Sequence, residues 1–111
     1  MRRFAQTIPL KDDPESIRRY GAYHANPWPE LLEGARKVGI LSTYIYRFGR
    51  QLFMFMQAQD DFDLERDMPK YAAKPKAREW DELMRDFQEP VPGAPQGSTW
   101  VEMKEVFACE A

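Results

Sequence analysis

The sequence contains one histidine, His24, and aromatic residues stand four positions before and after it, Tyr20 and Trp28. Side chains four residues apart share one face of a helix, so a phenol, an imidazole and an indole would form a wall. An imidazole has an ordinary pKa near neutrality, which makes His24 the candidate for general acid–base catalysis. Aromatic rings stack on the C–H faces of sugars while polar groups bind hydroxyls, so this trio is suited to a sugar.

Residues for other chemistries are missing from the sequence. One histidine and the single Cys109 do not make a typical zinc site, and the glycines are too scattered for a phosphate-binding loop. The acidic run at residues 60–65 lacks the alternating ligands and the glycine turn of a calcium loop. We therefore expect neither a metal nor a cofactor. The alternative for Tyr20, His24 and Trp28 is an ordinary packing role.

The composition indicates a globular protein. The chain has 111 residues, 43% of them hydrophobic and 14% aromatic, which predicts a single domain over residues 1–111. A formal net charge of −2 favours neither a nucleic acid nor a membrane as partner. No apolar stretch follows the N-terminal arginines, as a signal peptide would require, and the expected location is the cytoplasm.

Periodicity predicts the elements that would position the trio. Residues 3–10 alternate as a strand, with Phe4, Gln6 and Ile8 on one face. Asp13 and Pro14 begin a helix over residues 14–24, and Pro27 bends the chain before a second helix over residues 30–37. A hairpin of two strands follows, at residues 40–48 and 52–58.

The second half repeats the pattern. A helix begins at the acidic run and ends near Pro69, and another runs over residues 75–88 with Trp80 on its apolar stripe. After a loop rich in proline and glycine, residues 100–108 predict the last strand, with a bulge near Glu105 and Val106.

This order of elements predicts an α+β fold, a ferredoxin-like βαββαβ subunit with a four-stranded antiparallel sheet and helices on one face. The strand at residues 52–58 is apolar on both faces, so the open face of the sheet also needs a cover. A second copy of the chain is the simplest cover and would give a homodimer. Tyr44 and Tyr46 share a strand face and would reach either the site or the dimer interface.

The motif Tyr20-x-x-x-His24-x-x-x-Trp28-Pro29-Glu30 resembles the L-rhamnose mutarotase family, and landmarks along the whole chain support the likeness: Gly39, Ile45-Tyr46, Leu52-Phe53, Trp80 and Val106-Phe107. The resemblance implies a dimeric α+β barrel that interconverts the α and β anomers of a 6-deoxy-L-hexose without a cofactor. It also implies that His24 is the acid–base residue, and that Tyr20 and Trp80 lie in the sugar pocket.

Two departures from the family pattern bear on the substrate. Thr43 stands where the family has a tyrosine, and Glu79 stands before Trp80 where the family has paired tryptophans. Residues 11–14, 52–54, 60–63 and 88–90 are more similar to the branch associated with L-fucose, so we expect L-fucose to be preferred over L-rhamnose. The predicted catalytic residues are His24 and Tyr20, and the predicted substrate-binding residues are Trp28, Thr43, Tyr46, Glu79 and Trp80.

In the expected reaction, His24 protonates the ring oxygen while Tyr20, Tyr46 or a water molecule relays the other proton. General acid–base groups typically contribute ~10²–10⁴-fold, enough for a reaction that already runs in water. Two alternatives remain, because a fold does not fix a function. One is a cofactor-free monooxygenase or haem-binding protein of the same architecture, and the other is a sugar-binding module without catalysis.

Overall fold

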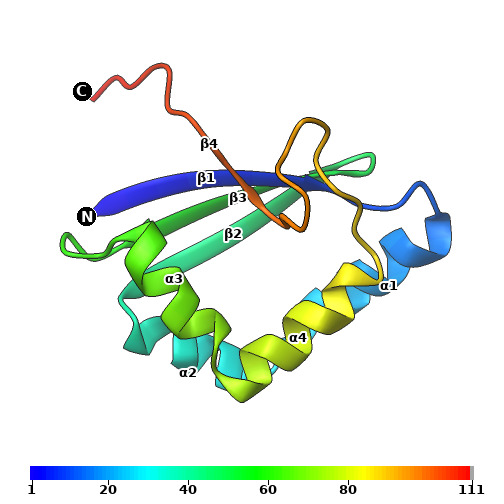
Figure 1. Cartoon of the computed structure of the whole chain (residues 1–111), viewed down its shortest axis with the longest axis horizontal. Coiled ribbons are helices and arrows are strands. Elements are labelled where there is room, and N and C mark those ends of the chain that lie inside the picture. Colours follow the sequence, from blue (N-terminus) through cyan, green and yellow to red (C-terminus); the bar gives the residue numbers. More distant parts are fainter. Residues whose placement is uncertain (111) are drawn as a thin grey trace.

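The computed structural model describes residues 1–110, as one antiparallel sheet with all four helices on the same side (Figure 1). The strands follow the order β2-β3-β1-β4 across the sheet. The elements are β1 (Arg2–Pro9), α1 (Pro14–Ala25), α2 (Pro29–Lys37), β2 (Ile40–Phe48), β3 (Gln51–Ala58), α3 (Leu64–Ala72), α4 (Pro75–Arg85) and β4 (Val101–Met103). The predicted ferredoxin-like α+β fold is confirmed.

Alternation along β1 and β3 decides which side chains face the helices. In the β1–β3 register, Phe4 lies opposite Met56 and Ile8 lies opposite Leu52, and all four are buried. These pairs belong to two separate hydrophobic clusters, one around Ile8 and Leu52 and the other around Phe4 and Met56. Gln6 stands between them on β1, so the helix-facing side of the sheet has a polar group at its centre.

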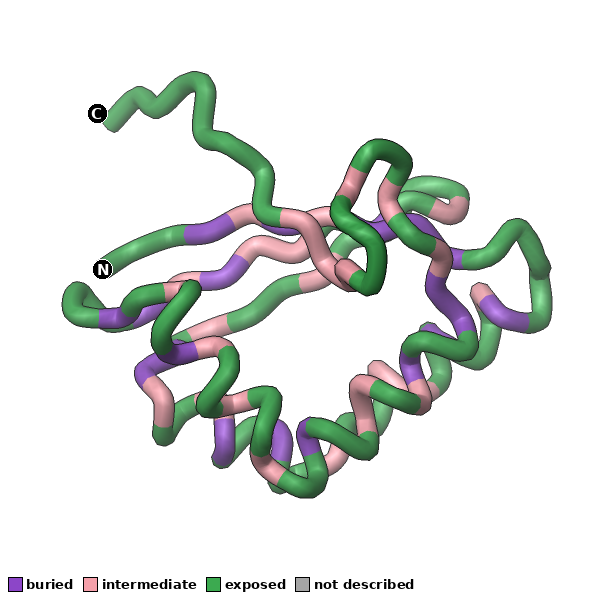
Figure 2. The backbone as a smooth tube through the Cα atoms, viewed as in Figure 1, coloured by how far each residue is buried: buried purple, intermediate pink, exposed green. Residues whose placement is uncertain are grey.

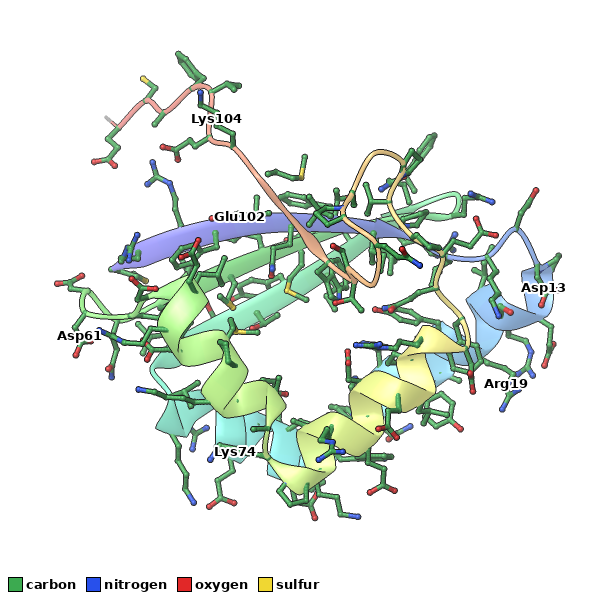
Figure 3. The ribbon with its side chains drawn as sticks, viewed as in Figure 1. Asp13, Arg19, Asp61, Lys74, Glu102 and Lys104 are labelled. Atoms are coloured by element: carbon green, nitrogen blue, oxygen red, sulfur yellow. The ribbon has the colours of Figure 1, made fainter. Side chains whose placement is uncertain are left out.

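The bend between α1 and α2 has local causes. The Asp13 carboxylate accepts the backbone N–H of Ser16 at 3.2 Å and so caps the start of α1 (Figure 3). The helix ends at Ala25, and the two prolines that follow cannot continue it. Pro29 then occupies the first position of α2, where a missing N–H costs nothing.

Helix α4 ends at Arg85, three residues before the predicted end, so that part of the prediction is wrong. The next residues pair with the end of β1 instead of continuing the helix. The Lys11 N–H donates to the Phe87 carbonyl at 2.9 Å, and the Glu89 N–H donates to the Pro9 carbonyl at 2.9 Å. These bonds fix Gln88 between α4 and the sheet.

Helix α3 passes through Pro69 and continues to Ala72, so the predicted end at Pro69 is also wrong. A proline inside a helix costs roughly 3 kcal/mol. Hydrogen bonds at the start of α3 stabilise it against this cost. The Asp63 carboxylate accepts the Arg66 N–H at 2.9 Å, and the Asp67 carboxylate accepts the Asp63 N–H at 2.8 Å.

The last strand is shorter than predicted, because β4 contains only Val101–Met103 and the expected bulge does not exist. Beyond Met103 the chain leaves β1 and extends away from the helices, where Lys104 lies (Figure 3). The Arg3 side chain binds the Glu105 carboxylate at 2.7 Å in place of a backbone ladder. Val106 and Phe107 are 88% and 81% exposed, and all of residues 104–110 are exposed (Figure 2).

The face of the sheet away from the helices carries a group of aromatic side chains and is uncovered in the single chain. Tyr46 on β2 lies opposite Phe53 on β3, and their rings stack with centroids 6.1 Å apart. Tyr44 and Phe48 lie on the same face and are exposed. The prediction that β3 is apolar on both faces therefore holds at Phe53 and Phe55 but not at Gln57, which lies on this side as well. We call this surface the open face.

Candidate functional site

A cavity of about 500 Å³ lies between the helix-facing side of the sheet and helices α1, α3 and α4. Gln6 from β1, Ile45 from β2 and Met54 from β3 form its sheet side. Tyr20 and His24 from α1 and Trp80 from α4 lie among the helix residues that line it. The cavity brings together three residues that the sequence predicted to share a site.

Burial favours the neutral imidazole of His24, and a hydrogen bond to its own helix fixes which ring nitrogen carries the proton. Its Nδ1 atom lies 2.9 Å from the Tyr20 carbonyl oxygen. A carbonyl only accepts, so Nδ1 carries the proton and donates it, which leaves a lone pair on Nε2. Burial lowers the pKa of His24, and the bond to the Tyr20 carbonyl opposes only part of that effect. The imidazole therefore has a basic nitrogen available at neutral pH.

Tyr20 lies one turn before His24 and supports its ring. The two rings stack with centroids 4.2 Å apart and planes at 28°. Tyr20 is buried, and burial raises the pKa of its phenol, while the neighbouring Gln88 side chain counteracts part of that rise. The phenol therefore stays protonated at neutral pH and can donate a hydrogen bond.

Trp80 connects the members of the predicted wall. Its indole meets the His24 ring edge to face, with centroids 5.2 Å apart, and meets the Trp28 ring at 5.1 Å. Trp28 does not line the cavity but packs behind Trp80, with Lys76 Nζ 5.6 Å from its ring centroid. The bend at Pro27 and Pro29 thus aims Trp28 at α4 and not at the cavity.

Three other predicted substrate-binding residues lie away from His24. Thr43 is exposed on the edge strand β2 and does not line the cavity. Tyr46 lies on the open face, separated from the cavity by the thickness of the sheet. Glu79 lies on the exposed side of α4, where its carboxylate pairs with Lys76 at 3.4 Å. The chain by itself does not bring these three to the candidate site.

The cavity also contains polar residues that sequence reasoning did not place there: Gln6, Glu65, Asp81, Arg85, Gln88 and Thr99. Asp81 and Arg85 form an ion pair along α4, with an N–O distance of 3.1 Å. Gln6 was detectable as a polar residue between Phe4 and Ile8 on one face of β1. Asp81 and Arg85 stand four residues apart on α4, but no local pattern joins them to Gln6, Glu65 or Thr99.

The described residues, 1–110, also bear on metal binding and on membrane insertion. No three side chains of histidine, cysteine, aspartate or glutamate in this range gather in a way that could hold a metal ion. In the same range, no helix has both the length and the apolar character needed to cross a membrane. The polar groups of the cavity are therefore amides, hydroxyls, one imidazole and a few charged side chains, which suits an uncharged polar ligand.

The order and antiparallel pairing of the strands, with the helices on one side, place this protein in the class of ferredoxin-like α+β proteins. A solved L-rhamnose mutarotase from Formosa agariphila superposes with a TM-score of 0.73 at 23% identity, over 99% of this chain and 100% of that one. Tetracenomycin F2 cyclase from Streptomyces glaucescens superposes with a TM-score of 0.71 at 16% identity, over 100% of this chain and 99% of that one. An antibiotic biosynthesis monooxygenase superposes with a TM-score of 0.57 at 16% identity, over 94% of this chain and 97% of that one. At these identities the likeness shows the fold.

Sequence comparison identifies the family. A family model described as L-rhamnose mutarotase matches residues 3–109. An L-fucose mutarotase from Xanthomonas campestris pv. campestris is 32% identical over 110 residues, covering 97% of this chain and 88% of that protein. A UPF0734 protein from Dictyostelium discoideum is 40% identical over 108 residues, covering 94% and 86%. The chain belongs to the L-rhamnose mutarotase family, a family of isomerases.

Proposed function

We propose that this protein is a mutarotase that interconverts the anomers of a 6-deoxy-L-hexose, with His24 as the acid–base residue. The observation that carries the proposal is the state of His24. Its Nδ1 is bonded to the Tyr20 carbonyl, and its ring lines a cavity beside Trp80, so Nε2 is the nitrogen available to a ligand. A cavity of about 500 Å³ is large enough for a monosaccharide.

The proposed reaction begins with His24 Nε2 as a base. Nε2 takes the proton of the anomeric hydroxyl, the bond between C1 and the ring oxygen breaks, and an aldehyde forms at C1. The imidazolium then gives the proton to the former ring oxygen. One nitrogen can serve both oxygens because both are attached to C1. Rotation about C1–C2 and the reverse steps close the ring as the other anomer, with no net gain or loss of protons.

Tyr20 and Trp80 have supporting roles in this proposal. The raised pKa of Tyr20 suits a hydrogen-bond donor to the sugar better than a base. The Trp80 ring borders the cavity and provides an apolar surface for the C–H face of the sugar. Tyr46, on the open face, has no part in proton transfer within one chain.

Saturation-transfer NMR of anomer exchange tests the proposal. We expect the protein to speed exchange of L-fucose, and the His24→Asn variant to lose that gain, by roughly 10²-fold or more. Arg18→Ala is the matched control, since Arg18 lies exposed on the same helix outside the cavity. Exchange at the buffer rate with the unaltered protein would exclude a mutarotase. Full exchange with His24→Asn would exclude the role of His24.

We also propose that L-fucose is preferred over L-rhamnose. The L-fucose mutarotase of X. campestris, at 32% identity, supports this preference. Thr43 and Glu79 do not line the cavity, so within one chain the preference would have to come from other lining residues. Parallel exchange measurements with both sugars test it, and faster exchange of L-rhamnose at equal concentration would reverse the assignment.

The open face supports a further proposal, a homodimer packed through the sheets. Exposed aromatic residues rarely form a continuous surface on a monomer. Here Tyr44, Tyr46, Phe48 and Phe53 lie side by side on β2 and β3. A second copy would cover them and would leave the cavity, on the other side of the sheet, free to bind its ligand.

A further inference from the structure

Two glutamine side chains are buried at the cavity, one from the first strand and one from the segment after α4. Gln6 on β1 and Gln88 after α4 are both 8% exposed, and both line the cavity with His24 and Trp80. Glutamine is mostly found exposed, because a buried amide must have its hydrogen bonds satisfied. Two buried amides at one cavity therefore require an explanation.

Gln6 occupies a position where an apolar residue would pack. Its neighbours on the helix-facing side of β1 are Phe4 and Ile8, and across the sheet it lies opposite Met54. Neither core cluster includes Gln6, which stands between them. Packing alone would favour a residue such as leucine at this point, so the amide is not explained by the core.

Gln88 is fixed in place and has an unused acceptor. The backbone bonds of Phe87 and Glu89 to the end of β1 hold it between α4 and the sheet. Its Oε1 has no hydrogen-bond partner among residues 1–110. In that range it is the one buried side-chain nitrogen or oxygen atom without a partner. Its amide also influences Tyr20, since it counteracts part of the rise in the phenol pKa. A hydroxyl that donates to Oε1 would complete the hydrogen bonding of this amide.

The charges around the cavity favour a neutral sugar over an acidic one. Arg85 is paired with Asp81 at 3.1 Å, and Glu65 adds a further negative charge at the rim. No lysine lines the cavity. A phosphate or carboxylate on the sugar would have no unpaired cation to meet it, whereas amides suit hydroxyls, which donate and accept in the same way.

We propose that Gln6 and Gln88 are specificity-determining residues that bind ring hydroxyls of a neutral monosaccharide. This inference rests on the proposed mutarotase function and adds the groups that recognise the sugar. His24 acts on the two oxygens at C1, and the two amides bind hydroxyls elsewhere on the ring. The pairing of each amide with one hydroxyl gives the sugar a single orientation over Trp80.

The test compares each amide variant against a series of monodeoxy sugars. Gln6→Met and Gln88→Met keep the side-chain length and remove the amide. We expect each variant to slow catalysed exchange of the parent sugar by roughly tenfold or more, because a buried hydrogen bond is lost. The same variant should show no further loss with the one deoxy sugar that lacks the matching hydroxyl. Gln96→Met is the matched control, since Gln96 is exposed and outside the cavity.

The outcomes separate the inference from the function on which it rests. Absence of exchange with the unaltered protein for every sugar overturns the mutarotase proposal itself. Exchange that persists within twofold in both amide variants overturns only the role of the glutamines. An equal loss for the parent and every deoxy sugar, with a lower unfolding temperature, also overturns it, because that pattern marks a purely structural role.

Discussion

The indole of Trp80 meets the imidazole of His24 edge to face, with ring centroids 5.2 Å apart and planes at 73°. These residues lie far apart in the sequence, His24 on α1 and Trp80 on α4. The imidazole also stacks on Tyr20 of its own helix, with ring centroids 4.2 Å apart. The ring is thus oriented by groups from two helices.

The first prediction concerns this contact. Replacing Trp80 with phenylalanine should slow catalysed anomer exchange about three- to tenfold, the size expected for loss of an edge-to-face pair. The Trp28→Phe variant should have a smaller effect, since Trp28 touches Trp80 but does not line the cavity. NMR exchange rates of both variants decide the matter. A larger loss in Trp28→Phe than in Trp80→Phe would contradict this ranking.

The second prediction concerns pH. Burial lowers the pKa of His24 below its ordinary value of 6.5, and the neutral ring is the active base in the proposed reaction. The catalysed rate, corrected for buffer, should therefore stay constant down to about pH 6.5 and fall only below it. A titration of His24 by NMR should give the same midpoint as the rate. A rate that already declines between pH 8 and pH 7 would disagree with a half-buried imidazole whose pKa lies below its ordinary value.

The third prediction concerns Asp67 on α3. Its carboxylate accepts hydrogen bonds from the Arg66 guanidinium and from the Asp63 N–H, and these hold the pKa of Asp67 well below 3.8. A carboxylate with a lowered folded-state pKa stabilises the fold above its ordinary pKa, and the stabilisation is lost as the pH falls further. Asp67→Asn should therefore lower the unfolding temperature at pH 7.

The difference between Asp67→Asn and the unaltered protein should shrink as the pH falls below about 3.8, where the Asp67 carboxylate of the unfolded chain takes up a proton while that of the folded chain is still ionised. Circular dichroism melts between pH 2 and pH 8 measure this. Asp61→Asn is the control, because Asp61 lies exposed nearby. Equal melting temperatures for Asp67→Asn and Asp61→Asn at pH 7 would show that the hydrogen bonds of Asp67 do not stabilise α3.

The fourth prediction concerns the open face. Tyr46 stacks on Phe53 at the centre of this surface and is 60% exposed in the single chain. Tyr46→Arg would place a charge in the proposed interface, and burying an unpaired charge is costly. Light scattering should give the mass of two chains for the unaltered protein and of one chain for Tyr46→Arg. Leu32→Arg, at an exposed leucine of α2, should leave the mass unchanged. Two chains in every sample would move the interface elsewhere.

The sequence was sufficient for strands β1, β2 and β3 and for the pair Tyr20 and His24, because these follow from local periodicity. The four-residue spacing that predicts a shared helix face places the two rings 4.2 Å apart. The same spacing was not sufficient for Trp28, since the helix stops between His24 and Trp28. Trp28 reaches the group only through Trp80, and a contact between two helices has no local pattern.

The C-terminal segment shows a different limit. Residues 100–108 alternate much as a strand does, yet only Val101–Met103 pair with β1. Alternation predicts that a segment can form a strand, but pairing also needs a neighbour in register along its whole length. The two cavity glutamines were missed for a related reason. Their meeting depends on how the end of α4 attaches to β1, which no short stretch of sequence encodes.

Alternate residues of strand β3 face opposite sides of the sheet. Leu52, Met54 and Met56 face the helices, while Phe53, Phe55 and Gln57 face the opposite way. Of the helix-facing residues, Met54 lines the cavity, while Leu52 and Met56 belong to the two core clusters. If the proposed homodimer forms through the open face, Phe53 and Phe55 belong to its interface. A comprehensive mutational scan of β3 should then resolve into two interleaved profiles, one of folding and turnover and the other of self-association, and the proposed catalysis and the proposed assembly could change independently.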